Sequence, residues 1–132
     1  MKYTLSFGYI NQVSTNIAEI IIDNCTLITD EMFDEYNEFI NKHFTKPYAV
    51  LVNSINTYSM TPEATERAAK NAALVAIASV SFGRESEQVV DQFLKDREAD
   101  NLNFRKFSGF EMGRNKAVRW LELELTKAKQ NA

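Results

Sequence analysis

Residues 48–67, YAVLVNSINTYSMTPEATER, decide the predicted fold because three kinds of segment follow one another there. Residues 48–55 form an apolar run of strand length, which is typical of a strand buried on both faces of a parallel sheet. Residues 53–60 are mostly polar and predict a loop. Thr61 and Pro62 are the residue types that favour the start of a helix. The order indicates an α/β protein, and it raises the question of whether this loop binds something or only connects.

Two strands and one helix are predicted before this stretch. Residues 3–9 alternate between apolar and polar side chains, and residues 17–22 are rich in isoleucine, so both segments favour strands that could pair as a hairpin through residues 11–16. Between Thr29 and Pro47, apolar side chains recur at spacings of three and four residues. This spacing predicts an amphipathic helix with Thr29 as its N-cap.

Two strands and three helices are predicted after residue 60. We expect a short helix from Pro62 to about Asn71, a strand from about Leu74 to Phe82, a helix over residues 85–97, a strand over residues 103–107 and a helix over residues 111–128. Residues 74–82 also allow a helix, because alanines are mixed with their β-branched residues. The candidates for the buried face of the last helix are Met112, Ala117, Trp120, Leu121 and Leu125.

The resulting order, β-β-α-β-α-β-α-β-α, predicts a single α/β domain over residues 1–132. Strands that alternate with helices indicate right-handed crossovers, so we expect a mostly parallel mixed sheet of four to five strands with helices packed on it. With 132 residues, of which 45% are hydrophobic and 25% charged, the chain has the composition of an ordinary folded domain and can bury a core without disulfides.

Charge and cysteine content limit the expected partners and location. The net charge of −3 argues against a nucleic-acid partner, because phosphate binding needs a concentrated basic surface. Cys25 is the single cysteine, which fits a reducing compartment. No apolar run approaches the roughly 20 residues of a membrane span. We therefore expect a cytoplasmic protein without membrane insertion, and a homo-oligomer is compatible with the sequence.

No set of residues for catalysis or metal binding can be assembled from the sequence. His43 is the only histidine, and its place at the negative end of the first predicted helix explains a cation there. A hydrolase that used Ser54 or Ser59 would need His43 as its base. No spacing of zinc ligands or of phosphate-binding glycines is present. We expect a protein that is not an enzyme and has no cofactor and no metal.

Two motifs resemble the SpoIIAA-like group of STAS domains, the sulfate-transporter and anti-sigma-factor antagonist domains. The first is YAVLVNSINTYSMTPEA, and the second is NFRKFSGFEMGRNKAVRWLELEL, in which Phe107 ends a short strand and Ala117, Trp120 and Leu121 follow in a helix. The resemblance implies a STAS-like sandwich and a small regulatory module. It also implies a phosphorylation switch at the start of the second helix. Thr61 and then Ser59 are the nearest candidate phosphoacceptors, although the Asp-Ser-Ser-Gly-type motif of that family is missing here.

The loop after the apolar strand is the predicted binding site for a protein partner or small ligand, because ligands of open α/β sheets bind at the carboxyl ends of strands. The residues that could bind there are Asn53, Ser54, Asn56, Tyr58, Ser59 and Thr61. The alternative is structural: Asn and Ser side chains satisfy the turn, and Thr61 only caps the helix. A different function, the carriage of a lipid or small apolar ligand, follows from the lipid-carrying domains grouped with STAS domains, and it would need an apolar cavity.

Overall fold

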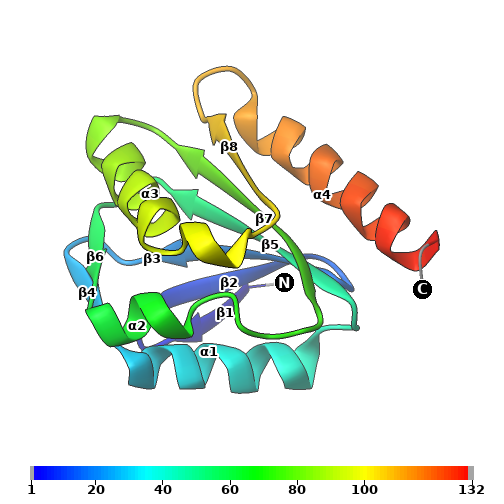
Figure 1. Ribbon diagram of the computed structural model, residues 1–132, viewed down its shortest axis with the longest axis horizontal. Helices are drawn as coiled ribbons and strands as arrows, with labels where there is room; N and C mark the ends of the chain where they lie inside the picture. Colours follow the sequence, from blue (N-terminus) through cyan, green and yellow to red (C-terminus); the bar gives the residue numbers. More distant parts are fainter. Residues whose placement is uncertain (1, 131–132) are drawn as a thin grey trace.

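The computed structural model describes residues 2–130, which form a six-stranded mixed sheet with helices on both faces (Figure 1). In spatial order its strands are β1 (Lys2–Leu5), β2 (Gly8–Ser14), β3 (Ile17–Ile22), β5 (Tyr48–Ser54), β7 (Leu74–Ser81) and β8 (Phe104–Ser108). The first three strands pair antiparallel. The pairs β3–β5, β5–β7 and β7–β8 are parallel.

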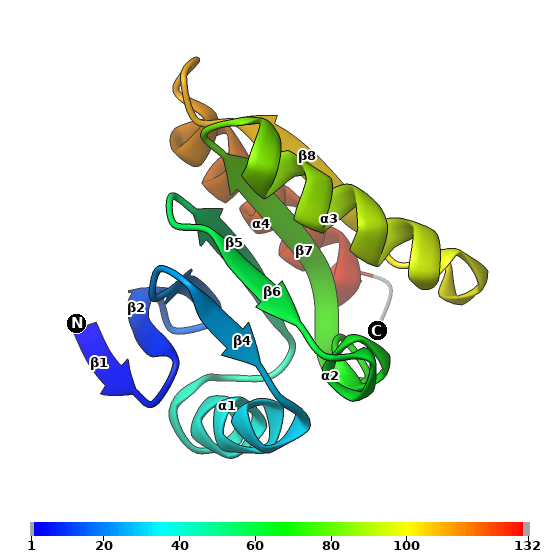
Figure 2. The same ribbon diagram turned by 90° about the vertical axis from the view of Figure 1, so that its left-hand side faces the viewer.

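A second, two-stranded parallel sheet lies away from the main one, between its helices (Figure 2). Its strands are β4 (Thr26–Ile28) and β6 (Tyr58–Met60). The helices are α1 (Asp30–His43), α2 (Pro62–Arg67), α3 (Arg84–Asp96) and α4 (Gly113–Gln130), with a 3-10 turn, Glu98–Asp100, after α3. Helix α4 lies on one face of the main sheet, and the other three helices lie on the opposite face together with β4 and β6 (Figures 1 and 2).

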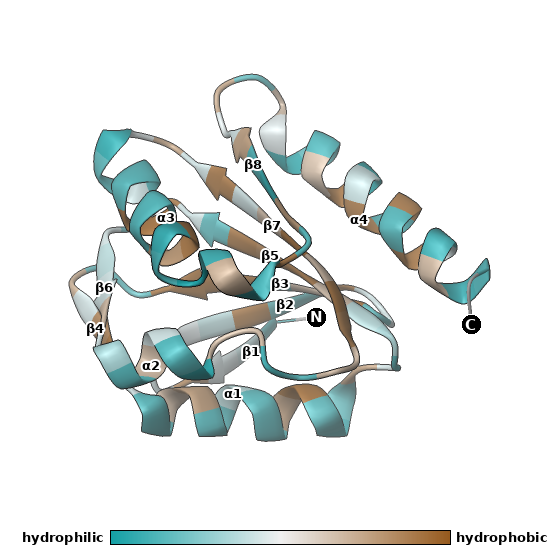
Figure 3. Cartoon of the chain, in the orientation of Figure 1, coloured by the Kyte–Doolittle hydropathy of each residue, from teal (hydrophilic) through white to brown (hydrophobic). Residues whose placement is uncertain are grey.

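Helix α4 packs closely because the strand residues beneath it are small. Its buried residues Ala117, Leu121 and Leu125 meet a cluster from β3, β5 and β7 that comprises Ile17, Ala49, Leu51, Ala76, Ala78 and Val80. Alanine side chains on the sheet let a helix approach, and nearly all of these residues are fully excluded from solvent. Figure 3 shows the same separation as colour, with hydrophobic residues along β5 and β7 and hydrophilic ones on the outer side of α4.

On the opposite face, α1 supplies the main cover. Tyr36, Ile40 and Phe44 of this helix pack against residues of β2, β3 and β5 that include Ile10, Ala18, Tyr48 and Val50. Thr29 caps α1, since its Oγ1 accepts a hydrogen bond from the Met32 backbone N–H at 3.3 Å. The predicted stripe and cap of this helix are therefore confirmed.

The sequence predicts the class of fold and most of its elements. The α/β class and the mostly parallel mixed sheet are confirmed, and residues 74–81 form strand β7 rather than a helix. That segment lies between β5 and β8, where burial on both faces favours its Val and Ile side chains over the helical preference of its alanines.

The strand count is a correction, because the sheet has six strands and two more form the small sheet. Residues 3–9 are not one strand: the chain turns at Ser6 and Phe7, and Gly8 opens β2 with a φ of 155°. A Cβ on Gly8 would lie 2.1 Å from the Ile21 carbonyl oxygen, so this close approach needs glycine. The alternation of apolar and polar side chains continues through Ser6 and Phe7, so the sequence pattern does not indicate the turn.

Two further corrections concern helices. Helix α2 ends at Arg67 rather than near Asn71, and Met112 is 68% exposed rather than part of the buried face of α4. Met112 lies just before the first residue of α4, in a left-handed conformation with a φ of 57°, so it is not part of the helix. Ala117, Leu121 and Leu125 are buried as predicted, and Trp120 packs at the edge of their cluster.

Arg97, at the end of α3, ties that helix to α2. Its side chain is 7% exposed, and Nη1 donates to the backbone carbonyls of Thr65 at 2.8 Å, Glu66 at 3.3 Å and Ala68. Its Nε pairs with Asp100, which lowers the pKa of that carboxyl. These carbonyls at the end of α2 have no helical partner, so one guanidinium satisfies them.

Arg97→Ala is expected to lower the free energy of unfolding by about 2–4 kcal/mol, because it removes charge-assisted hydrogen bonds and leaves buried carbonyls unpaired. Urea unfolding measures the loss. Arg119→Ala is the control on an exposed position of α4 and should change stability by less than about 0.5 kcal/mol. An equal, small effect of the two substitutions would contradict the role assigned to Arg97.

Candidate functional site

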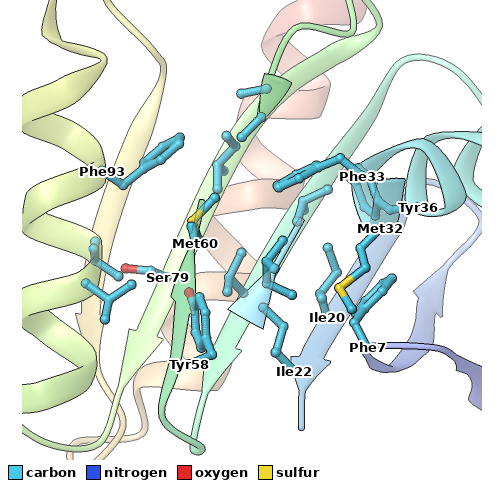
Figure 4. Close-up of a pocket in the computed structure, with 18 of the residues that line it drawn as sticks. Phe7, Ile20, Ile22, Met32, Phe33, Tyr36, Tyr58, Met60, Ser79 and Phe93 are labelled. Carbon is cyan, nitrogen blue, oxygen red and sulfur yellow. The ribbon is translucent and has the colours of Figure 1, made fainter. Parts of the chain in front are cut away.

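A pocket of about 120 Å³ lies between the main sheet and helices α1 and α3, and it is partly open to solvent (Figure 4). Its floor is the face of the main sheet opposite α4. The residues that form this floor are Ile20 and Ile22 of β3, Val50 and Val52 of β5, and Ile77 and Ser79 of β7. They alternate with residues that pack under α4, as the period of a strand requires.

Two helices form the side walls of the pocket. Met32, Phe33 and Tyr36 of α1 line one side, and Val90 and Phe93 of α3 line the other. These helices approach the sheet from different places and do not meet over it (Figure 2). The space between them is therefore left for another element to cover.

The small sheet β4–β6 forms the cover. Ile28 of β4 and Tyr58 and Met60 of β6 line the pocket, whereas Leu27 and Ser59, which pair in the same sheet, are exposed. The alternation follows the strand period, with one face toward the pocket and one toward solvent. The loop singled out from the sequence therefore carries part of the pocket wall.

The pocket is apolar and uncharged. Among the described residues that line it there is no Lys, Arg, His, Asp or Glu, and its polar side chains are those of Ser79, Tyr36 and Tyr58. Burial raises the pKa of the Tyr58 phenol above its usual value. Burial raises the pKa of the Tyr36 phenol well above its usual value. Both phenols are thus neutral near pH 7, and the site has no fixed charge.

The polar residues of the predicted site make bonds within the fold. Asn53 Nδ2 donates to Glu19 Oε2 at 2.8 Å, and Asn56 Nδ2 donates to the Ile22 carbonyl at 3.0 Å. Thr61 Oγ1 accepts from the Ala64 N–H at 3.1 Å and caps α2. These bonds favour the structural alternative for all three side chains.

The other predicted residues lie in different surroundings. Tyr58 lines the pocket, Ser59 is exposed on the opposite side of β6, and Ser54 is 1% exposed at the end of β5. Of the six candidates, the structure therefore brings only Tyr58 into the pocket. As candidate phosphoacceptors, Ser59 has an exposed side chain, whereas the hydroxyl of Thr61 is occupied by the helix cap.

The histidine is far from these serines. His43 ends α1 and stacks on Phe39 with ring centroids 4.4 Å apart. It precedes the amino end of β5, whereas Ser54 ends that strand and Ser59 follows it. A strand of this length spans roughly 20 Å, so the fold separates His43 from both hydroxyls.

Sequence reasoning missed most of the pocket-lining residues. Met32, Phe33 and Tyr36 belong to the apolar stripe of α1, and Val90 and Phe93 belong to that of α3, so each was expected in a filled core. An apolar side chain beside a cavity has the same sequence pattern as one in a packed interior. The high content of Phe and Met was the one available signal.

An ion pair between the buried Glu19 and the partly exposed Arg114 lies on the other face of the sheet. Glu19 is 2% exposed and accepts from Arg114 Nε at 3.0 Å and Nη2 at 2.9 Å, from Asn53 at 2.8 Å and from Asn11 at 3.3 Å. Burial alone would raise the pKa of Glu19, but these hydrogen bonds and the charge of Arg114 outweigh it and hold the pKa below its usual value. The pair fixes the first turn of α4 on β3 and leaves the carboxylate fully partnered.

Comparisons with other proteins found no relative. No protein-family model matches the chain, and neither a curated protein nor a solved structure matches it. The resemblance to STAS domains therefore stays a prediction. In residues 2–130, no group of three or more His, Cys, Asp or Glu side chains could hold a metal ion. Within the same range, each helix is too short or too polar to cross a membrane.

Thr61→Ala should reduce the free energy of unfolding by about 1 kcal/mol, because the Ala64 N–H loses its side-chain acceptor. Ser59→Ala, two residues away on the exposed side of β6, should leave stability nearly unchanged. Thermal or urea unfolding of both variants tests this difference. A Thr61→Ala variant as stable as the natural protein would show that the cap contributes nothing.

Glu19→Gln should destabilise the protein most near neutral pH. Since the folded-state pKa of Glu19 is lowered, its contribution is present above the unfolded-state value, near 4.5, and disappears as pH falls through the folded-state value. Unfolding free energies of the two proteins at pH 7 and pH 3 should therefore converge at the lower pH. A difference that stays constant with pH would contradict the linkage.

Proposed function

We propose that this protein is a small binding module without catalytic activity that holds a compact apolar ligand in the pocket beneath β6. The observation that carries the proposal is the uncharged pocket of about 120 Å³ between α1, α3 and the sheet. Ligand pockets in proteins are concave, mostly apolar and equipped with few polar groups. This pocket has that character.

The size of the pocket favours a compact ligand over a long-chain lipid. An engineered cavity of about 150 Å³ lined by apolar side chains holds a single benzene molecule. A pocket of about 120 Å³ that is partly open thus suits a ring or a short branched chain. The walls support this because the flexible side chains of Met32 and Met60 can adjust to the shape of a guest.

The absence of catalysis is part of the same proposal. A general acid or base must lie within hydrogen-bond reach of the reacting group, and the described pocket-lining residues include no histidine and no carboxylate. Reversible uptake and release of a ligand in such a pocket would suit a carrier or a sensor.

Recognition of a protein partner by the outer side of the same segment is the second candidate. Ile55, in the turn between β5 and β6, is 59% exposed, and Leu27 of β4 is 51% exposed. Leu27 pairs with Ser59 in the small sheet, and exposed apolar side chains such as these two suit contact with a partner. In this second function, the regulatory module would bind the ligand in its pocket, and a partner would recognise the ligand-bound protein at the exposed side of β4–β6.

Val52→Phe should abolish binding of benzene, because the added ring would project from β5 into the floor of the pocket. Binding is followed by the chemical shifts of backbone amides during a benzene titration of the isotope-labelled protein. In the natural protein the shifts should saturate and should centre on the pocket-lining residues.

Leu27→Phe is the matched control, since it makes a similar enlargement on the solvent side of β4 and should leave binding unchanged. A natural protein whose pocket residues show no saturable shift would refute the proposed function. Solvent extraction of the purified protein, followed by gas chromatography, would reveal a neutral ligand that is retained.

A further inference from the structure

One hydroxyl in the pocket has no hydrogen-bond partner. Four buried side-chain polar atoms in the described residues lack a partner, namely Tyr48 Oη, Asn53 Oδ1, Ser54 Oγ and Ser79 Oγ. Of these four residues only Ser79 lines the pocket, and its side chain is completely excluded from solvent. Figure 4 shows it among the apolar side chains of the site.

The strand period fixes the direction of the Ser79 side chain. Its neighbours Ala78 and Val80 belong to the cluster under α4, so Ser79 and Ile77 face the opposite side, toward the pocket. Ser79 pairs in register with Val52 of β5, which is also part of the floor. The Ser79 side chain therefore lies on the pocket side of the sheet, at the β7 side of the floor.

An unpaired buried hydroxyl is unfavourable, and most buried polar side-chain atoms in proteins have a hydrogen-bond partner. At this position alanine would fit and would avoid the cost, as it does at Ala78 on the other face. A ligand that brings a donor or acceptor would satisfy the hydroxyl. A charged ligand group would find no counter-ion, and burial without one is far more costly.

We infer that the ligand is a neutral compact molecule with an apolar body and one hydrogen-bonding group, such as an alcohol, phenol or ketone, and that this group pairs with Ser79 Oγ. The inference rests on the proposed function and adds the class of ligand to it. Carboxylates, including fatty acids, are excluded from the pocket. Ser79 is the residue that sets this preference.

Phenol, benzene and benzoate are suitable probes because they share one ring and differ in the polar group. Dissociation constants come from amide chemical-shift titrations at pH 7, where phenol is neutral and benzoate is charged. The quantity of interest is the ratio of the benzene constant to the phenol constant. Ser79→Ala should lower this ratio about three- to tenfold, which corresponds to the loss of one neutral hydrogen bond.

Ser59→Ala is the matched control, because it removes a hydroxyl from the exposed side of β6, outside the pocket lining. This variant should keep the ratio of the natural protein. Neither substitution should prevent folding, since Ser79→Ala removes an unsatisfied hydroxyl and Ser59 is exposed, and thermal unfolding verifies that both variants fold.

Each outcome distinguishes the inference from the proposed function. A ratio that falls in Ser79→Ala alone, with no saturable shifts for benzoate, supports the inference. If the ratio is the same in all three proteins, or if benzoate binds as tightly as phenol, the assigned ligand class is wrong while apolar binding stands. If neither benzene nor phenol binds the natural protein, the proposed function itself fails.

Discussion

Strand β5 must be covered on both of its faces, and the rest of the structure depends on this requirement. It lies in the interior of the six-stranded sheet between β3 and β7, and residues 48–51 are buried. On the face of Ala49 and Leu51 a single helix, α4, packs against small side chains and leaves a filled core. On the face of Val50 and Val52, helices α1 and α3 and the small sheet divide the task. The pocket is the space left between α1, α3 and the small sheet.

Residues 53–61, from the end of β5 to the cap of α2, both connect two elements and line the pocket, two roles that the sequence presents as alternatives. Its polar residues hold its ends, since Asn53 bonds to Glu19, Asn56 bonds to the end of β3, and Thr61 caps α2. Because both ends are fixed, the strand between them can pair with β4 and turn Tyr58 and Met60 toward the sheet. The polar groups of this segment therefore connect it to the fold, and its apolar side chains form part of the pocket wall.

Buried polar groups in this fold are of two kinds, those with hydrogen-bond partners and those without. The charged ones are surrounded by partners: Glu19 accepts four hydrogen bonds, and Arg97 satisfies the carbonyls at the end of α2. An unpaired charge would be costly in either place. Ser79 carries no charge, so its unpaired hydroxyl costs far less than an unpaired charge would. The charged groups thus hold the structure together, whereas the Ser79 hydroxyl contributes no hydrogen bond to it.

The sequence by itself determined the order of the helices and of strands β3, β5, β7 and β8, the caps at Thr29 and Thr61 and the burial of residues 48–51, because these features depend on neighbours a few residues away. Only the tertiary structure decided the rest. Strands of three residues such as β4 and β6 are too short to show a period, and each exists because the other pairs with it across about thirty residues of chain. Glu19 and Arg114, 95 residues apart, meet only through the packing of α4. The pocket has no signature in the sequence, because whether Met32 and Phe93 fill a core or line a cavity depends on how far apart the sheet holds their helices.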